Sequence, residues 1–153
     1  MSRSTVERQW TAHGLDCAVL WIAMSMGGHR CGYVRVPESH PWYGLSYNDE
    51  APQGAADYAD RDIDDAGMAG MISVLGGQRT IDSWARRVEA HVAVHGGLTY
   101  AGNLRGAGLS DGWWFGFDCA HLDDSPERWT EDAVAAETER MAEQIAAAGR
   151  VTT

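Results

Sequence analysis

The feature that most constrains the fold is a pair of strand-like segments joined by a glycine turn. Residues 17–24 form a continuous apolar run of strand length, as expected of a central strand covered on both faces. Residues 25–28, which end in two glycines, supply a turn. Residues 29–36 then alternate, with Val34 and Val36 on one face. This pattern predicts a β-hairpin.

Other segments extend the sheet or connect it. Residues 88–95 alternate between valine-rich and histidine-bearing faces, and residues 113–121 are rich in aromatic side chains, so both are predicted to be strands. Residues 37–54 contain two Pro-aromatic stretches without periodicity and are expected to form a long loop. A short helix is expected within residues 67–75.

The C-terminal stretch predicts an amphipathic helix that lies across the sheet. Thr130 is its expected N-cap and Gly149 its expected stop. One face of this helix carries a stripe of residues at helical spacing that can pack on the sheet: Val134, Thr138, Met141, Ile145 and Ala148. We therefore predict a single α+β domain over residues 1–153, with a mainly antiparallel sheet, this helix packed on it, and an acidic loop at about residues 48–66.

Charge and composition exclude several classes of partner. The chain has 22 acidic and 12 basic residues and a formal net charge of −10. A nucleic-acid polymer or an anionic membrane surface normally requires a basic patch, so neither is expected as a partner. The N-terminus has no secretory apolar region, and the longest apolar run is too short to span a bilayer. The three cysteines form no CxxC pair, which favours a cytoplasmic, reducing environment.

Two segments resemble metal-binding patterns, but neither fits well. Asp60, Asp62 and Asp64 resemble the start of a calcium loop, but its sixth and twelfth positions hold Asp and Met instead of Gly and Glu. The strand face of Glu89, His91 and His95 offers zinc or iron ligands. However, its two histidines would lie about 13 Å apart along a strand. The sequence therefore predicts no metal and no cofactor.

A polar-aromatic pocket is expected where three His/Gly/aromatic segments meet. The 95–100 segment places two glycines after a predicted strand, where the backbone can turn and expose N–H groups to a ligand. Residues 118–121 follow the aromatic strand, and the thiol of Cys119 is expected to be buried and inert. The predicted ligand-binding residues are Arg35, His40, Trp42, Tyr43, His95, Gly96, Gly97, Tyr100, Trp114, Asp118 and His121.

These motifs resemble a group of small bacteriophage-encoded proteins. The resemblance runs from about residue 17 to the terminal helix, and its most specific parts are the HGGLTY segment at 95–100 and the WWFGFDCAH segment at 113–121. The group brings no established activity with it. The resemblance implies a phage origin and a role in the cytoplasm of the infected host.

Three functions stay open from the sequence. The first is a small-molecule-binding protein that sequesters a nucleotide-derived host immune signal without turnover. Bases would stack on its exposed aromatic rings, and phosphates would meet Arg30, Arg35 and Arg105. The second is a metal- or His/Asp-dependent hydrolase or nuclease. The third is a protein-interaction module that binds a host protein or another copy of itself, as a homo-oligomer.

Overall fold

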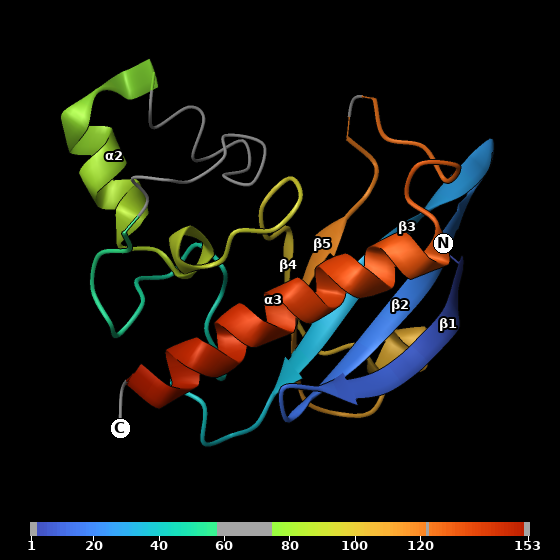
Figure 1. Ribbon diagram of the computed structural model, residues 1–153, viewed down its shortest axis with the longest axis horizontal. Coiled ribbons are helices and arrows are strands. Elements are labelled where there is room, and N and C mark those ends of the chain that lie inside the picture. The colour runs from blue at the N-terminus through green and yellow to red at the C-terminus, as the bar shows by residue number, and fades with distance from the viewer. Residues whose placement is uncertain (1–2, 58–74, 122, 152–153) are drawn as a thin grey trace.

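An antiparallel sheet with one long helix across it forms the body of the protein (Figure 1). The computed structural model describes residues 3–57, 75–121 and 123–151. Five strands lie in the order β1-β2-β3-β5-β4, and α3 (Glu131–Val151) packs on β1, β2 and β3. The strand bounds are β1 Arg3–Ala12, β2 Leu15–Met24, β3 Gly27–Val36, β4 Tyr100–Gly102 and β5 Trp113–Asp118. The predicted α+β class, with an antiparallel sheet and a C-terminal helix on it, is confirmed.

The predicted hairpin is present, with a tighter turn than expected. Met24 pairs with Gly27, so only two residues lie between β2 and β3. Gly27 has φ +98°, a conformation that L side chains rarely adopt. Alternate residues of β2 belong to different cores: Val19 packs on the side of α3, whereas Leu20 packs on the opposite face. The apolar run therefore does form an inner strand covered on both faces.

Strand β1 was not predicted, because its sequence is polar. It pairs antiparallel with β2 at the edge of the sheet and is largely exposed or half-buried. Its side chains hold the start of α3: Arg8 Nε donates a 2.8 Å hydrogen bond to Glu131. Trp10 Nε1 donates a 2.9 Å bond to Glu139. Such contacts between distant segments leave no periodic apolar signal in the sequence.

Helix α3 begins as predicted and ends later than predicted. Thr130 Oγ1 accepts a 3.2 Å hydrogen bond from the Ala133 N–H, as an N-cap does. Gly149 does not end the helix, which continues to Val151. A Cβ at Gly149 would lie 2.9 Å from the His40 ring. The glycine is therefore explained by close packing on His40, and the prediction that it stops the helix was wrong.

The segment before the glycine turn is not a strand. Residues Val88–His91 form a 3₁₀ helix, η2, and residues 92–95 continue without pairing to the sheet. Their backbone is bonded to the 37–54 loop instead: the Val88 N–H donates to Asp49 O and the Glu89 N–H to Tyr47 O. The strand predicted over 88–95 was therefore wrong, because these local loop contacts replaced a sheet partner.

The remaining elements are short. Along the chain, helix α2 (Gln78–Ala85) precedes η2, and the 3₁₀ helix η3 (Arg105–Ala107) lies between β4 and β5. Strand β5 ends at Asp118, three residues earlier than predicted, where the Asp118 carboxylate accepts the Ala120 N–H in a turn. The helix expected within 67–75 and the acidic loop beyond residue 57 lie almost wholly outside the described residues. Among the described residues, no helix has the length and apolar character needed to cross a membrane.

Candidate functional site

A histidine–carboxylate pair lies at the end of the sheet beside the start of α3. His95 follows the 3₁₀ helix, and its Nε2 lies 2.9 Å from each carboxylate oxygen of Asp124. The Trp129 ring covers one face of the imidazole, with centroids 4.2 Å apart and a tilt of 33°. Asp124 therefore orients the imidazole through Nε2, and none of the described residues forms a hydrogen bond with Nδ1.

The glycine turn brings the backbone of His95 and the ring of His121 together. Gly96 and Gly97 have φ +69° and +78°, so both occupy the left-handed region that favours glycine. A Cβ added to Gly96 would overlap Nε2 of His121. The two glycines of the HGG sequence therefore have two roles. Both allow the turn, and Gly96 also leaves room for the imidazole of His121.

Glu137 of α3 binds the backbone of the same turn. Its Oε2 accepts a 2.7 Å hydrogen bond from the His95 N–H. Burial raises the pKa of Glu137, but hydrogen bonds from Arg140 and the His95 N–H outweigh burial, so the pKa lies below its ordinary value. An ionised Glu137 thus ties the His95 backbone to the helix.

His121 completes the group. Its ring meets that of His95 edge-on, with centroids 5.4 Å apart and planes at 78°. Nε2 lies 3.2 Å from Asp118 Oδ1, which is within ion-pair distance. The atom is nevertheless buried without a hydrogen bond to any residue that the structure describes, because the approach of Asp118 lacks hydrogen-bond geometry. Two imidazoles, each beside a carboxylate, therefore face each other.

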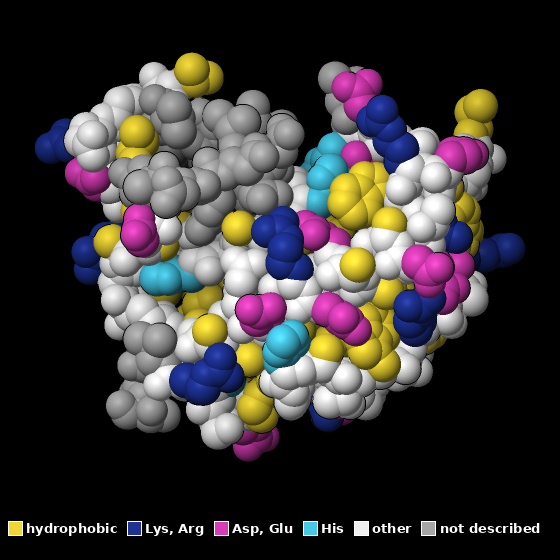
Figure 2. All heavy atoms as spheres, viewed as in Figure 1, with side chains coloured by type: hydrophobic (Ala, Val, Ile, Leu, Met, Phe, Trp, Pro, Cys, Tyr) yellow, Lys and Arg dark blue, Asp and Glu magenta, His cyan; other side chains and the backbone are white. Residues whose placement is uncertain are grey.

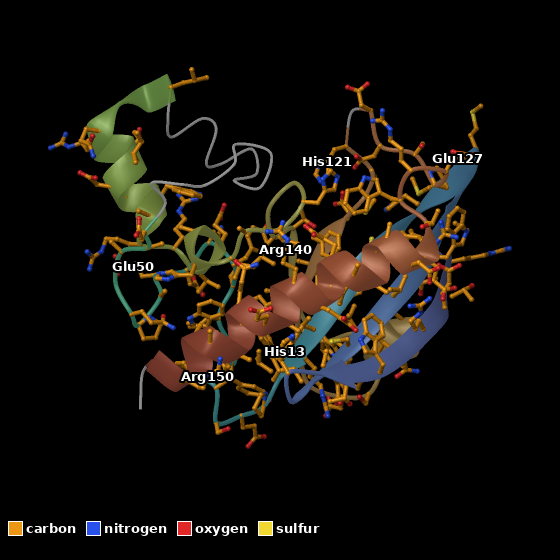
Figure 3. The ribbon with its side chains drawn as sticks, in the orientation of Figure 1. His13, Glu50, His121, Glu127, Arg140 and Arg150 are labelled. Atoms are coloured by element: carbon orange, nitrogen blue, oxygen red, sulfur yellow. The ribbon has the colours of Figure 1, made fainter. Side chains whose placement is uncertain are left out.

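This group, which we call the histidine cluster (His95, Asp118, His121 and Asp124), reaches the surface. Figure 3 labels His121 in the loop that follows β5, near the N-terminal half of α3. In the same orientation, Figure 2 shows histidine side chains at the surface beside a hydrophobic patch and acidic groups. Ligand atoms of His95, His121 and Asp124 all lie within 4.8 Å of one another, an arrangement able to hold a metal ion.

His40 does not join this cluster. Its Nε2 bonds to Ile145 O at 2.8 Å, and its Nδ1 accepts the Trp42 N–H at 3.0 Å. Ile145 is eight residues beyond Glu137 on α3, about 12 Å along the helix. Burial lowers the pKa of His40, although the bond to Ile145 opposes this. The prediction that the His40 loop meets the His95 turn was therefore wrong: His40 packs the far half of α3.

Two of the predicted stacking aromatics are buried, and a third is partly buried. Trp42 is fully buried against Phe115, and its Nε1 donates to Gln53. Trp114 is buried in the second core, on the face of the sheet opposite α3. Tyr100 packs edge-on against Tyr33 in that core. Neither of the two buried rings presents a free face to a base.

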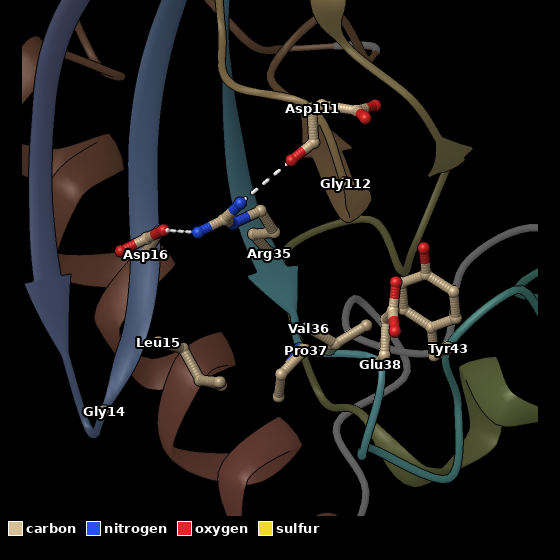
Figure 4. Close-up of a pocket in the computed structure, with 10 residues that line it drawn as sticks. All are labelled: Gly14, Leu15, Asp16, Arg35, Val36, Pro37, Glu38, Tyr43, Asp111 and Gly112. Carbon is tan, nitrogen blue, oxygen red and sulfur yellow. Dashed lines mark hydrogen bonds and ion pairs between the residues drawn. The ribbon is translucent and has the colours of Figure 1, made fainter.

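Arg35 and Tyr43 line a separate pocket of about 410 Å³, shown in Figure 4. Arg35 is held there by an ion pair with Asp16 and a 2.9 Å bond to the Asp111 carbonyl. The carboxyl groups of Asp16, Glu38 and Asp111 belong to this pocket's lining residues, while Tyr43 is 40% exposed. The pocket therefore offers phosphate a single arginine, which is already paired and lies among three acidic residues, so it is poorly suited to bind phosphate.

Five of the residues that meet at the turn were predicted from the sequence, and three of their partners were missed. The five are His95, Gly96, Gly97, Asp118 and His121. Missed were Asp124, Trp129 and Glu137. The spacing of His121 and Asp124 offered a weak signal, since the His121 N–H bonds to that carboxylate at 3.0 Å. Glu89 and His91 lie apart, bonded to Trp84 and to Gly54 O.

No family model, curated protein or solved structure matches this chain. The resemblance to phage-encoded proteins therefore stays a prediction.

Proposed function

We propose that the protein is a hydrolytic enzyme whose catalytic centre is the histidine cluster. The observation that carries the proposal is the pair of imidazoles that meet edge-on, with centroids 5.4 Å apart and a carboxylate beside each. Imidazole is the side chain best suited to carry protons near neutral pH, and a neighbouring carboxylate sets its orientation. This favours the second of the three functions considered from the sequence.

The cluster has the parts that hydrolysis needs. A water molecule activated there attacks the electrophilic atom of the substrate, its proton passing to a side chain of the cluster. The bond to the leaving group breaks, and the leaving group receives a proton in turn. Trp129 shields one face of His95 from water, which strengthens the electrostatic effect of Asp124.

Contacts of the arginines weigh against capture of a phosphate-bearing signal. Arg30 donates a 2.7 Å bond to Glu7, Arg105 lies 3.4 Å from Asp111, and Arg35 is paired with Asp16. A phosphate would have to displace a carboxylate in each case. The net charge of −10 adds to this, so we propose a small substrate that is neutral or cationic, not a nucleic-acid polymer.

The resemblance described above supports a phage origin and action in the host cytoplasm. We include both in the proposal. The three free cysteines, all buried, are compatible with a reducing environment.

Activity against chromogenic substrates tests the proposal. The panel is p-nitrophenyl acetate, p-nitrophenyl phosphate, its diester and p-nitroanilides of single amino acids, which cover the common hydrolytic classes. We expect turnover of at least one, lowered about 10²- to 10⁴-fold in His95→Asn and His121→Asn. His13→Asn is the matched control, because His13 is exposed in the β1–β2 turn, with Glu143 4.0 Å away. Equal activity in all three variants would refute the assignment.

The pocket beside Arg35 favours a second function, retention of a small ligand without turnover. Its volume of about 410 Å³ suits a small molecule. Protein purified from a bacterial lysate would be heat-denatured and the supernatant analysed by mass spectrometry. Release of an intact compound, abolished by Tyr43→Ala but not by His121→Asn, would support this function over hydrolysis.

A further inference from the structure

We propose that His95, His121 and Asp124 bind one divalent transition-metal ion of the zinc class. The use of this ion to activate water rests on the hydrolytic function proposed above, whereas its binding rests on the geometry alone. Two imidazoles and a carboxylate, with the fourth position open to water, form a common ligand set of catalytic zinc. Imidazole ligands favour zinc and its transition-metal neighbours over magnesium or calcium.

The separations of the ligand atoms suit one ion. Nε2 of His95 is 2.9 Å from each oxygen of Asp124, and all three ligand atoms lie within 4.8 Å of one another. Tetrahedral bonds of about 2.0–2.1 Å place ligand atoms about 3.4 Å apart. Reaching that geometry requires side-chain rotations of His95 and His121, whose side chains are 22% and 37% exposed.

An independent observation points to the same place. Nε2 of His121 is buried and has no hydrogen-bond partner among the described residues. A buried polar atom left unsatisfied costs about 1–3 kcal/mol. Asp118, 3.2 Å away, is not aligned to relieve this cost. A metal ion would satisfy the nitrogen by accepting its lone pair.

Neighbouring groups orient the three proposed ligand residues, as second-sphere residues do at metal sites. The His121 N–H bonds to Asp124 Oδ2 at 3.0 Å and orients that carboxylate. Glu137 fixes the His95 backbone, and Trp129 fixes its ring. Such outer contacts set the direction of ligand atoms before the metal arrives.

The ligand set also defines a role for Asp118. A bound zinc ion lowers the pKa of its water to about 7, so hydroxide is available at neutral pH. Asp118 is the member of the histidine cluster outside the ligand set, beside His121. Within the histidine cluster it is therefore the carboxylate left to accept the proton that the bound water loses.

Metal titration of the full chain tests the site. Protein freed of metal with EDTA would be titrated with Zn²⁺ by calorimetry and with Co²⁺ by visible absorption. We expect one equivalent of each to bind, with absorption bands typical of four-coordinate Co²⁺ and no comparable response to Mg²⁺. His121→Asn and Asp124→Asn should each weaken binding about 10- to 100-fold or more.

Two matched variants control for loss of charge and of imidazole. Asp123→Asn removes an adjacent carboxylate at φ +72°, a conformation that Asn tolerates. His13→Asn removes an imidazole elsewhere. Both should bind Zn²⁺ like the parent chain, and circular dichroism would confirm that each variant is folded. Absence of stoichiometric binding by the parent chain, or equal weakening in Asp123→Asn and Asp124→Asn, would overturn the proposed site.

The outcomes separate this site from the proposed function. Stoichiometric zinc without hydrolysis of any substrate would retain the site and refute the hydrolase. Hydrolysis that persists in EDTA, by protein without bound metal, would retain the hydrolase and refute the use of the ion to activate water, whereas the titrations alone decide whether the site binds metal.

Discussion

The imidazole of His121 lies directly against the backbone of Gly96, where no side chain would fit. Gly96 follows His95 in a turn with φ +69°, so the contact joins two segments that are far apart in the sequence. The glycine thereby sets the 5.4 Å distance between the two imidazole centroids. A change at this single position should disturb both the fold and the site.

Gly96→Ala is expected to lower the free energy of unfolding and to disrupt the histidine cluster. Backbone strain at a positive φ contributes about 1 kcal/mol, and displacement of the His121 ring adds to it, for a total of about 2–4 kcal/mol. Urea unfolding followed by circular dichroism measures the loss. Zn²⁺ affinity of the folded variant should fall as well.

Gly14→Ala is the control for strain alone. Gly14 has φ +77°, but a Cβ there would meet no atom within 4 Å. It should lose only about 1 kcal/mol and keep Zn²⁺ affinity unchanged. If the two alanine variants lost the same stability and bound zinc equally well, the contact between Gly96 and His121 would not be important.

Local signals explain which parts of the fold were predictable. The β2–β3 hairpin and the start of α3 follow from a glycine turn, an apolar stripe and a Thr130 cap, all within a few residues of one another. Strand β1 pairs with the adjacent β2, and its side chains also contact α3 across more than a hundred residues, as Arg8 does with Glu131. No local pattern carries that information, and its polar sequence hides the strand.

The candidate site could likewise be predicted only in part from the sequence. Glycines after a histidine indicated a turn with a function, and this identified His95 and Gly96. Asp124 and Glu137 lie in a loop and on a helix where acids are common, so nothing marked them before folding. His40 shared the same residue type and loop position, yet its ring packs against α3 because Gly149 leaves room for it.

Gly32→Ala should be among the most destabilising single changes on the sheet. Gly32 of β3 faces α3, and a Cβ there would overlap Thr138 Oγ1 and lie 2.5 Å from Phe117. Both neighbours are buried, so the helix would have to move away from the sheet. We expect a loss of about 3 kcal/mol or more in urea unfolding.

The double variant Gly32→Ala with Thr138→Ala tests whether overlap with Thr138 causes this loss of stability. Removing the hydroxyl relieves one of the two overlaps, so stability should recover in part. The single Thr138→Ala variant leaves a small cavity and should cost about 1 kcal/mol. No recovery in the double variant would show that the overlap with Thr138 is not what limits the approach of α3.

His40→Gln should reduce the dependence of stability on pH. Nδ1 of His40 accepts the Trp42 N–H, so the neutral ring carries its proton on Nε2, toward Ile145 O. Burial lowers its pKa below the ordinary value of 6.5. As pH falls below about 6.5, the unfolded chain binds a proton that the folded chain resists, and the free energy of unfolding decreases by up to about 1.4 kcal/mol per pH unit.

Urea midpoints of the parent chain and of His40→Gln, measured from pH 8 to pH 5, give this effect as a difference. Other titrating groups are common to both chains and cancel. The gap between the two free energies should be constant above about pH 7 and should change in favour of His40→Gln below about pH 6.5. Parallel curves throughout this range would mean that His40 titrates alike in the folded and unfolded states.

The three cysteines should not react in the folded protein. Cys17, Cys31 and Cys119 are each at most 5% exposed. Burial raises the pKa of Cys17 and of Cys31 to about 12 and that of Cys119 further still. Ellman's reagent at pH 8 should therefore detect no thiol in the native protein within minutes and three per chain in guanidinium chloride. Iodoacetamide should likewise leave hydrolysis unchanged. A native thiol that reacts fast, with loss of activity, would contradict this expectation. If peptide mapping located the modification at Cys119, that residue, which directly follows Asp118 at the end of β5, would become the candidate nucleophile.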